Sequence, residues 1–173
     1  RHARSRRTAL DVSGVKRAFY IKRYFSPSLS YTLKDIFRPS KASRAWKASR
    51  MLSRFGFHTA PTCAAGERRF LGILREAFLI TDEVRAPSLT DFAARFSSSS
   101  VPETVRRKRE LLRRFGAEVG RMHLLGILHG DLVPGNILVD ETSIPAKFVF
   151  LDNDRTRRFF RNLPLKLVER NLV

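Results

Sequence analysis

The feature that most constrains this chain is a stiff polar loop that is followed, after two apolar stretches, by a second polar loop. The first loop is His129-Gly-Asp-Leu-Val-Pro-Gly-Asn136, and the second is Leu151-Asp-Asn-Asp154. The apolar stretches between them, Ile137–Val139 and Phe148–Leu151, are separated by a short segment that contains Pro145, which favours a β-hairpin. A hairpin returns the chain to its starting point, so we expect the two polar loops to converge.

The polar side chains of these loops suit phosphoryl transfer. Asp131, Asn136 and Asp152 offer two carboxylates and one amide oxygen, which are hard ligands of the kind that Mg²⁺ takes together with phosphate oxygens. A phosphoryl-transfer site needs such a metal and a carboxylate that orients the attacking hydroxyl. The alternative is a plain turn, since Asp, Pro, Gly and Asn all favour turns.

The rest of the chain predicts an α+β fold. Apolar and polar residues alternate in strands expected at Thr8–Val12 and Arg17–Phe25, around a turn at Ser13-Gly14. A helix is expected over Ser43–Phe55, with Gly56 at its C-terminal end, and Ser26–Ser40 is expected to be a connector. The further expected elements are a strand pair at Cys63–Phe70 and Ile73–Thr81, a short helix containing Leu89, Phe92 and Phe96 before a serine run at Ser97–Ser100, and a long helix from Pro102.

One face of the long helix is expected to be apolar and the other basic. Leu112, Phe115, Val119 and Met122 recur at three- and four-residue steps, which predicts a core-facing stripe. The opposite face is arginine-rich, with Arg106, Arg107, Lys108, Arg109, Arg113 and Arg114. We interpret it mainly as a solvated face.

Charge and composition limit the partners. The 173 residues carry 34 Lys and Arg against 16 Asp and Glu, a net charge of +18, which indicates an anionic partner such as nucleic acid, acidic lipid or a phosphorylated substrate. The single cysteine, Cys63, excludes an intrachain disulfide and fits a reducing compartment. No segment reads as a signal peptide or a membrane span. Because the chain opens at Arg1 without Met, we expect a fragment or a processed form.

The two polar loops resemble the catalytic and metal-binding loops of the protein-kinase-like superfamily. The resemblance implies that Asp131 is the catalytic base and that Asn136 and Asp152 bind the metal. Lys22, in Phe19-Tyr-Ile-Lys-Arg-Tyr-Phe25, is similar to the strand lysine that holds the α- and β-phosphates of ATP. A histidine-glycine pair before the aspartate is typical of kinases that act on sugars and small molecules.

Within the superfamily the chain is most similar to the bacterial lipopolysaccharide core kinases, which phosphorylate Kdo or heptose. The segments that carry this likeness are Arg44-Ala-Trp46 with Phe55–Pro61, Phe78–Val84, and the two loops up to Arg155, which together cover about residues 8–155. Phe78–Val84 resembles the hinge strand, which implies that Glu83 and Val84 bind the nucleotide. The resemblance implies a two-lobed kinase-like fold that is truncated, with residues 1–84 as the first lobe and residues 85–173 as part of the second.

The implied function is ATP- and Mg²⁺-dependent transfer of phosphate to a sugar hydroxyl of the lipopolysaccharide inner core. The acceptor would be an acidic glycolipid, so we expect a cytoplasmic protein in peripheral contact with the anionic inner face of the inner membrane. Four arginines that follow the second loop are expected to bind the acceptor or the membrane: Arg155, Arg157, Arg158 and Arg161. We expect no nucleic-acid partner, because aromatic-basic readout motifs are absent.

Departures from the family pattern leave other functions open. Ala45 stands where protein kinases have the helix glutamate that pairs with the lysine, although Glu67, Glu76 or another acid could substitute. No glycine-rich loop precedes Thr8, and the chain ends soon after Asp152. The alternatives are an aminoglycoside- or choline-type phosphotransferase, whose cationic acceptors suit the basic charge poorly, and a degenerate, non-catalytic module that binds anions.

Overall fold

The computed structural model describes residues 3–12, 14–25, 38–95, 101–160 and 163–172. The chain divides into two compact units, Arg1–Val84 and Arg85–Val173, each with strands and helices, and the expected α+β class is confirmed. The expected features at Ser13, Phe96, Ser97–Ser100 and most of the connector lie outside the described residues.

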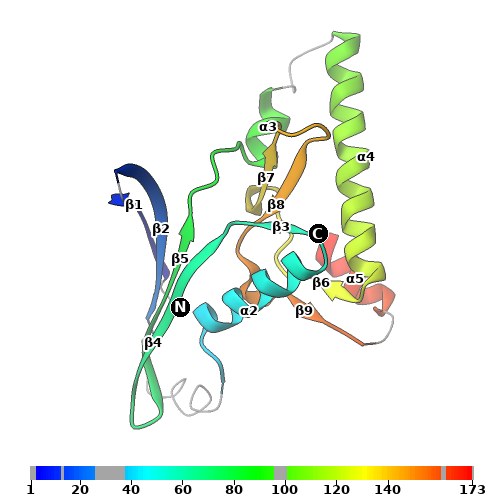
Figure 1. Cartoon of the computed structure of the whole chain (residues 1–173). Coiled ribbons are helices and arrows are strands. Elements are labelled where there is room, and N and C mark those ends of the chain that lie inside the picture. The colour runs from blue at the N-terminus through cyan, green and yellow to red at the C-terminus, as the bar shows by residue number, and fades with distance from the viewer. Residues whose placement is uncertain (1–2, 13, 26–37, 96–100, 161–162, 173) are drawn as a thin grey trace. The chain divides into compact units, whose positions relative to one another are not determined.

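The first unit is built on a four-stranded antiparallel sheet with the order β1-β2-β5-β4 (Figure 1). Its strands are β1 (Ala3–Val12), β2 (Val15–Phe25), β4 (Thr62–Phe70) and β5 (Ile73–Asp82), and a two-residue strand, β3 (His58–Thr59), precedes β4. β1 begins five residues before the predicted strand. It lies at the edge of the sheet with mostly exposed side chains, so no apolar alternation marks its first half.

A helix rich in alanine, α2 (Lys41–Arg54), packs on one face of this sheet. Ser40 caps its N-terminus, since the Ser40 hydroxyl accepts a hydrogen bond from the Ser43 N–H at 3.1 Å, and this cap starts the helix two residues before the predicted position. Gly56 follows the helix with φ +77°, as expected for a C-terminal glycine.

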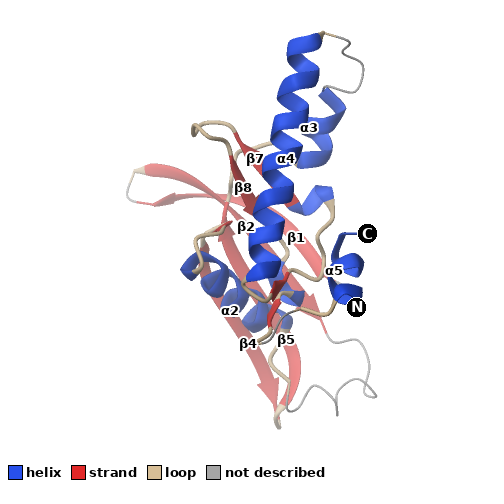
Figure 2. Ribbon diagram, turned by 90° about the vertical axis from the view of Figure 1, so that its right-hand side faces the viewer, coloured by secondary structure: helices blue, strands red, loops and turns tan. Residues whose placement is uncertain are grey.

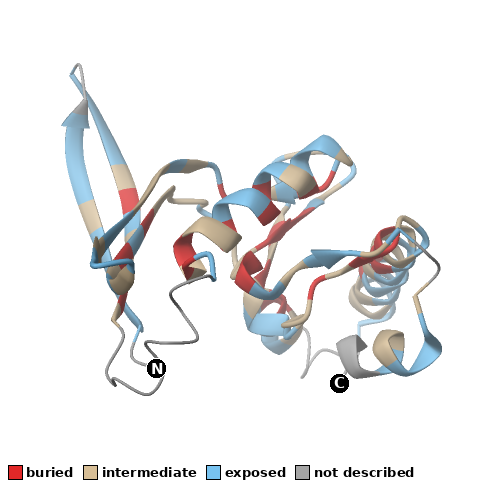
Figure 3. Cartoon of the chain, turned by 90° about the horizontal axis from the view of Figure 1, so that it is seen from below, coloured by how far each residue is buried: buried red, intermediate tan, exposed pale blue. Residues whose placement is uncertain are grey.

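The core of the first unit lies between α2 and the sheet. Ala42 and Ala45 of the helix pack with Tyr24 of β2 and with Ala77 and Leu79 of β5, and all five are buried. Alanine side chains allow the helix backbone to approach the strands closely. Figure 3 shows the resulting contrast between buried and exposed residues along the helix.

The second unit combines helices with short antiparallel pairs (Figure 2). Its helices are α3 (Leu89–Arg95), α4 (Pro102–Leu124) and α5 (Leu165–Leu172), with one-turn 3₁₀ helices at Pro134–Asn136 and Asn153–Arg155. Its strands are β6 (Ile127–Leu128), β7 (Ile137–Asp140), β8 (Lys147–Phe150) and β9 (Arg157–Arg158). β7 pairs with β8 as the predicted hairpin, and β6 pairs with β9.

The predicted apolar stripe of α4 is wrong at one position. Leu111 is buried, whereas Leu112 is 44% exposed. At 100° per residue, Leu111 lies on the same side of the helix as Phe115, Val119 and Met122, and Leu112 lies farther round. The Phe115 ring meets the Phe148 ring edge-on at 5.3 Å, which fixes this face of α4 against β8.

The basic face of α4 is partly neutralised by its own acids. Arg106, Arg113 and Arg121 each pair with a glutamate three residues earlier, and Arg107 pairs with Glu141. Arg114, expected on the solvated face, instead donates to the Ala146 carbonyl at 2.7 Å. Among the described residues, no helix has the length and hydropathy needed to cross a bilayer.

Candidate active site

The first polar loop begins at a buried histidine and ends in a one-turn helix. His129 follows β6 and has no exposed surface. Gly130 takes φ +77°, which turns the chain so that the Asp131 side chain is partly exposed. Pro134 opens the 3₁₀ turn, which closes when the Asn136 N–H donates to the Val133 carbonyl at 2.8 Å.

The β7–β8 hairpin brings the second loop beside the first. Ile137 lies opposite Phe150 in the register, and the Leu151 N–H donates to the Asn136 carbonyl at 2.8 Å. Asp152 is the next residue along the chain. Asp131, Asn136 and Asp152 therefore belong to two loops that the hairpin holds together.

The side chain of Asn136 is oriented by the loop itself. Its Nδ2 donates to the Asp131 carbonyl at 3.1 Å, so the amide oxygen is the group left to bind a cation. Asp131 and Asp152 are both only partly buried, which leaves their carboxylates accessible. The donors present, two carboxylates and one amide oxygen, fit the hard-oxygen preference of Mg²⁺. Among the described residues, no three His, Cys, Asp or Glu side chains gather as a metal-binding group, and this set contains only two such residues.

Asp152 has an unusual backbone conformation. Its φ of 56° and ψ of 46° lie in the left-handed region, which costs a residue other than glycine about 1–2 kcal/mol. Such a conformation persists only where the surrounding contacts hold it. The neighbours on both sides supply these contacts, through the Leu151 N–H described above and through Asn153.

Asn153 is the site residue that the sequence analysis missed. It is buried, its Oδ1 lies 2.9 Å from Nε2 of His129, and its Nδ2 donates to the Phe150 carbonyl at 3.3 Å. Since an amide oxygen only accepts, Nε2 of His129 carries the hydrogen. Burial lowers the pKa of His129, against the opposing effects of Asn153 and of the Asp131 and Asp152 carboxylates, so the ring is neutral at pH 7. No local sequence pattern singles out Asn153, which is separated from the end of β8 by Leu151 and Asp152.

Lys22 lies in the first unit, on the α2 side of the sheet. It is opposite Leu79 in the register, it is half-buried, and its Nζ lies 5.8 Å from the centre of the Tyr24 ring. Ala45, at the position of the kinase glutamate, is part of the buried core. The structure describes the two units separately, so the relation of Lys22 to Asp131 stays a prediction.

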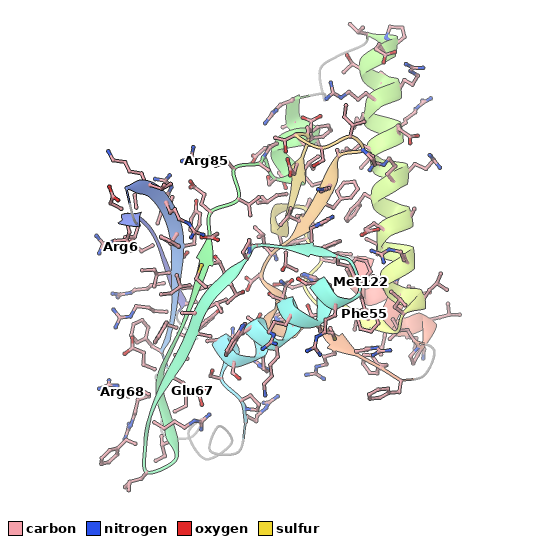
Figure 4. All side chains as sticks on the ribbon, viewed as in Figure 1. Arg6, Phe55, Glu67, Arg68, Arg85 and Met122 are labelled. Carbon is pink, nitrogen blue, oxygen red and sulfur yellow. The ribbon has the colours of Figure 1, made fainter. Side chains whose placement is uncertain are left out.

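The acids considered as substitutes for the helix glutamate contact arginines. Glu76 accepts from Arg23 at 2.7 Å, and Glu67 accepts from Arg69 at 2.8 Å. The hydrogen bond from Arg69 lowers the pKa of Glu67, and hydrogen bonds from Ser40 act in the same direction. Glu67 and its neighbour Arg68 project to opposite sides of β4 (Figure 4).

The expected hinge residues, Glu83 and Val84, follow β5. The Glu83 N–H donates to the Ala18 carbonyl at 2.9 Å, and the Glu83 carboxylate accepts from Arg7 Nη2 at 2.9 Å. Val84 is partly buried.

The described arginines that follow the second loop have different surroundings. Arg155 Nη1 lies 3.8 Å from Asp131 Oδ1. Arg157 and Arg158 are exposed neighbours on β9 and so project to opposite faces, and the Arg158 guanidinium lies 5.7 Å from the centre of the Phe160 ring. Arg161 lies outside the described residues.

The paired loops and the lobe that carries them define a kinase-like protein, and comparison with solved structures agrees. The structure of WaaP in complex with acyl carrier protein matches with a TM-score of 0.68 at 22% identity, over 97% of this chain and 64% of that one. At that identity the likeness shows the fold, and it confirms the expected kinase-like architecture.

The chain belongs to the lipopolysaccharide kinase (Kdo/WaaP) family, because the sequence model of that family matches residues 1–172. It is also similar to the lipopolysaccharide core heptose(I) kinase WaaP of Escherichia coli, with 29% identity over 136 residues. That alignment covers 76% of this chain and 50% of the relative, so the chain spans about half the length of that kinase. The predicted family is confirmed.

Gly130 offers a direct test of the loop geometry. A Cβ at this position would lie 2.9 Å from the Arg155 carbonyl oxygen, in addition to the cost of its positive φ. Gly130→Ala should therefore lower the free energy of unfolding by about 2 kcal/mol or more. Chemical denaturation measures this change.

Gly135→Ala is the matched control, because Gly135 lies in the same loop and a Cβ there meets no atom within 4 Å. We expect it to change stability by less than about 1 kcal/mol. Equal losses in the two variants would contradict the close approach of the loops.

Proposed function

We propose that this protein transfers the γ-phosphate of ATP to a sugar hydroxyl, Kdo or heptose, of the lipopolysaccharide inner core. The observation that carries the proposal is the hairpin that holds Asp131 and Asn136 on one loop beside Asp152 on the other, joined by the Leu151–Asn136 hydrogen bond. Membership of the lipopolysaccharide kinase family supports the choice of acceptor. The sequence similarity to the heptose(I) kinase supports a sugar rather than a protein as the substrate.

In the proposed reaction Asp131 orients the acceptor hydroxyl and takes its proton as the oxygen attacks the γ-phosphorus. The new bond joins the acceptor oxygen to phosphorus, and the bond between that phosphorus and the bridging oxygen of ADP breaks. Asn136 and Asp152 would hold Mg²⁺, which when bound neutralises the charge on the phosphates. Arg155, beside Asp131, is positioned to hold an anionic group of the acceptor.

The nucleotide contacts are assigned to the first unit. Lys22 would hold the α- and β-phosphates, and Glu83 and Val84 would contact the base. The ring of Tyr24, whose centre lies 5.8 Å from the Lys22 Nζ, supports a defined position for the lysine.

We assign the contact with an anionic membrane surface to the region where the C-terminal end of α4 meets the segment after β9. Three large apolar side chains of these segments and of α5 are strongly exposed: Leu124 at 89%, Phe160 at 96% and Leu165 at 78%. The Phe159 N–H donates to the Gly126 carbonyl at 2.8 Å, which brings the segments of Phe160 and Leu124 together. Apolar side chains beside arginines suit a surface of lipid phosphates and acyl chains. The protein would then act in the cytoplasm, at the inner face of the inner membrane.

A non-catalytic module that binds anions is the second candidate, and the burial of Ala45 in the core favours it. Glu67 and Glu76, the acids considered as substitutes for the helix glutamate, contact arginines. An acceptor series separates the possibilities: phosphate transfer to lipopolysaccharide core sugars supports the proposal, transfer to aminoglycoside or choline indicates a small-molecule kinase, and no transfer to any of them indicates the binding module.

Asp131→Asn tests the proposed base. The change keeps the size of the side chain and removes its ability to take a proton, so the turnover number should fall by a factor of about 10²–10⁴ while ATP affinity is kept. Asp152→Ala should instead weaken Mg²⁺·ATP binding. Radiolabelled phosphate transfer and nucleotide titration measure the two effects.

Asp140→Asn is the control for charge, since Asp140 ends β7 and its Oδ1 accepts from the Thr142 N–H at 3.0 Å and from the Thr142 hydroxyl at 2.6 Å. It should retain full activity. Full activity of Asp131→Asn would refute the assignment of the base.

The membrane surface is tested by co-sedimentation with vesicles that contain anionic lipid. Replacing Arg157 and Arg158 by Gln should weaken binding, and replacing Phe160 by Ser should weaken it further, because charge and apolar contact both contribute. Binding should fall steeply with salt.

The matched control replaces Lys108 and Arg109 by Gln, which removes the same charge from the side of α4. If this control weakens binding equally, the attraction is a general effect of net charge. Tight binding to duplex DNA, with no preference for anionic glycolipid, would contradict the assignment.

A further inference from the structure

The segment that carries Asp152 is held to the first loop by side-chain hydrogen bonds to His129. Asn153 reaches Nε2 of His129 at 2.9 Å, and the Thr156 hydroxyl donates to the His129 carbonyl at 3.2 Å. Both His129 and Asn153 are buried, with 0% and 5% of their surfaces exposed. A buried hydrogen bond between two polar side chains costs more to break than an exposed one, because the freed groups are left without water.

The hydrogen bond between Asn153 and His129 is adjacent in sequence to Asp152. Asp152 is the residue of the second loop, among those described, that has a left-handed backbone conformation and is not glycine. A residue in that conformation returns to an ordinary one unless its neighbours are fixed. The Leu151 N–H fixes the residue before it, and the Asn153 amide fixes the residue after it, to His129 on one side and to the Phe150 carbonyl on the other. Asp152 therefore lies between two residues that are both held by hydrogen bonds.

We infer that Asn153 is a positioning residue that, through its buried hydrogen bond to His129, holds Asp152 in its left-handed conformation with the carboxylate ready to bind a divalent cation. This inference rests on the proposed function, since it concerns the same metal site. The hydrogen bond between the Asn153 amide and the His129 imidazole would keep the second loop in this conformation before nucleotide or metal binds. The loop would then need no rearrangement on binding.

The first test uses the chain without metal or nucleotide. In Asn153→Ala and in the milder Asn153→Ser, backbone amides of residues 151–156 should exchange with deuterium at least about tenfold faster than in the wild type, while the amides of α4 keep their rates. The ¹⁵N spectrum of the wild-type His129 ring should show the hydrogen on Nε2. A hydrogen on Nδ1 would overturn the inference, and so would faster exchange spread equally over α4, which would indicate a packing role only.

The second test measures how phosphate transfer depends on Mg²⁺. In both variants the Mg²⁺ concentration for half-maximal activity should rise about tenfold, with the acceptor KM unchanged and activity restored by excess Mg²⁺, because residues that orient metal ligands alter metal affinity by factors of about 10–100. An unaltered Mg²⁺ dependence with a lower maximal rate would overturn the inference.

Thr142→Ala is the matched control for both tests. It removes a side-chain hydrogen bond of 2.6 Å to Asp140 from the β7–β8 turn of the same unit, at the end of the hairpin away from the loops. It should leave loop exchange and Mg²⁺ dependence unchanged, and equal effects in this control would overturn the inference. If the wild type transfers no phosphate, the proposed function fails, and the exchange test alone decides whether Asn153 holds the loop.

Discussion

Antiparallel pairing of β7 with β8 is the constraint on which the candidate site depends. The pairing turns a separation of sixteen positions, Asn136 to Asp152, into spatial proximity, and the Leu151–Asn136 hydrogen bond extends it by one residue into the loops. Without the hairpin the carboxylates would lie on unrelated segments.

The cores of the two units are packed by different kinds of side chain. In the first unit, alanines let α2 approach the sheet closely, and Ala45 belongs to that core. A glutamate there would bring a charge into an apolar layer, which is costly without a partner. The absence of the kinase glutamate is thus consistent with how this helix packs. In the second unit, the hairpin is supported by the edge-on contact of Phe115 of α4 with Phe148 of β8.

Prediction from the sequence worked where a local pattern and the tertiary structure agree. The hairpin was predictable because two apolar stretches flank a short polar segment, and α2 because small and apolar residues recur at helical spacing. Leu112 was placed wrongly because Leu111 and Leu112 both fit a spacing of three or four, and only the contact of Phe115 with Phe148 selects between them. Asn153 was missed because its importance comes from a partner 24 residues away, which no local pattern reveals. The roles of Asp131, Asn136, Asp152 and Lys22 came from family resemblance and remain predictions.

If the two loops bind one divalent cation together, Mn²⁺ in place of Mg²⁺ should report on both loops at once. Paramagnetic Mn²⁺, added with ATP to the ¹⁵N-labelled chain, broadens the amide signals of residues near it. We expect the signals of residues 131–136 and 151–154 to broaden together at low Mn²⁺ concentration, and Asp152→Ala to remove the effect from both loops. Broadening confined to one loop, or centred on another acidic segment, would show that the two loops do not share a cation.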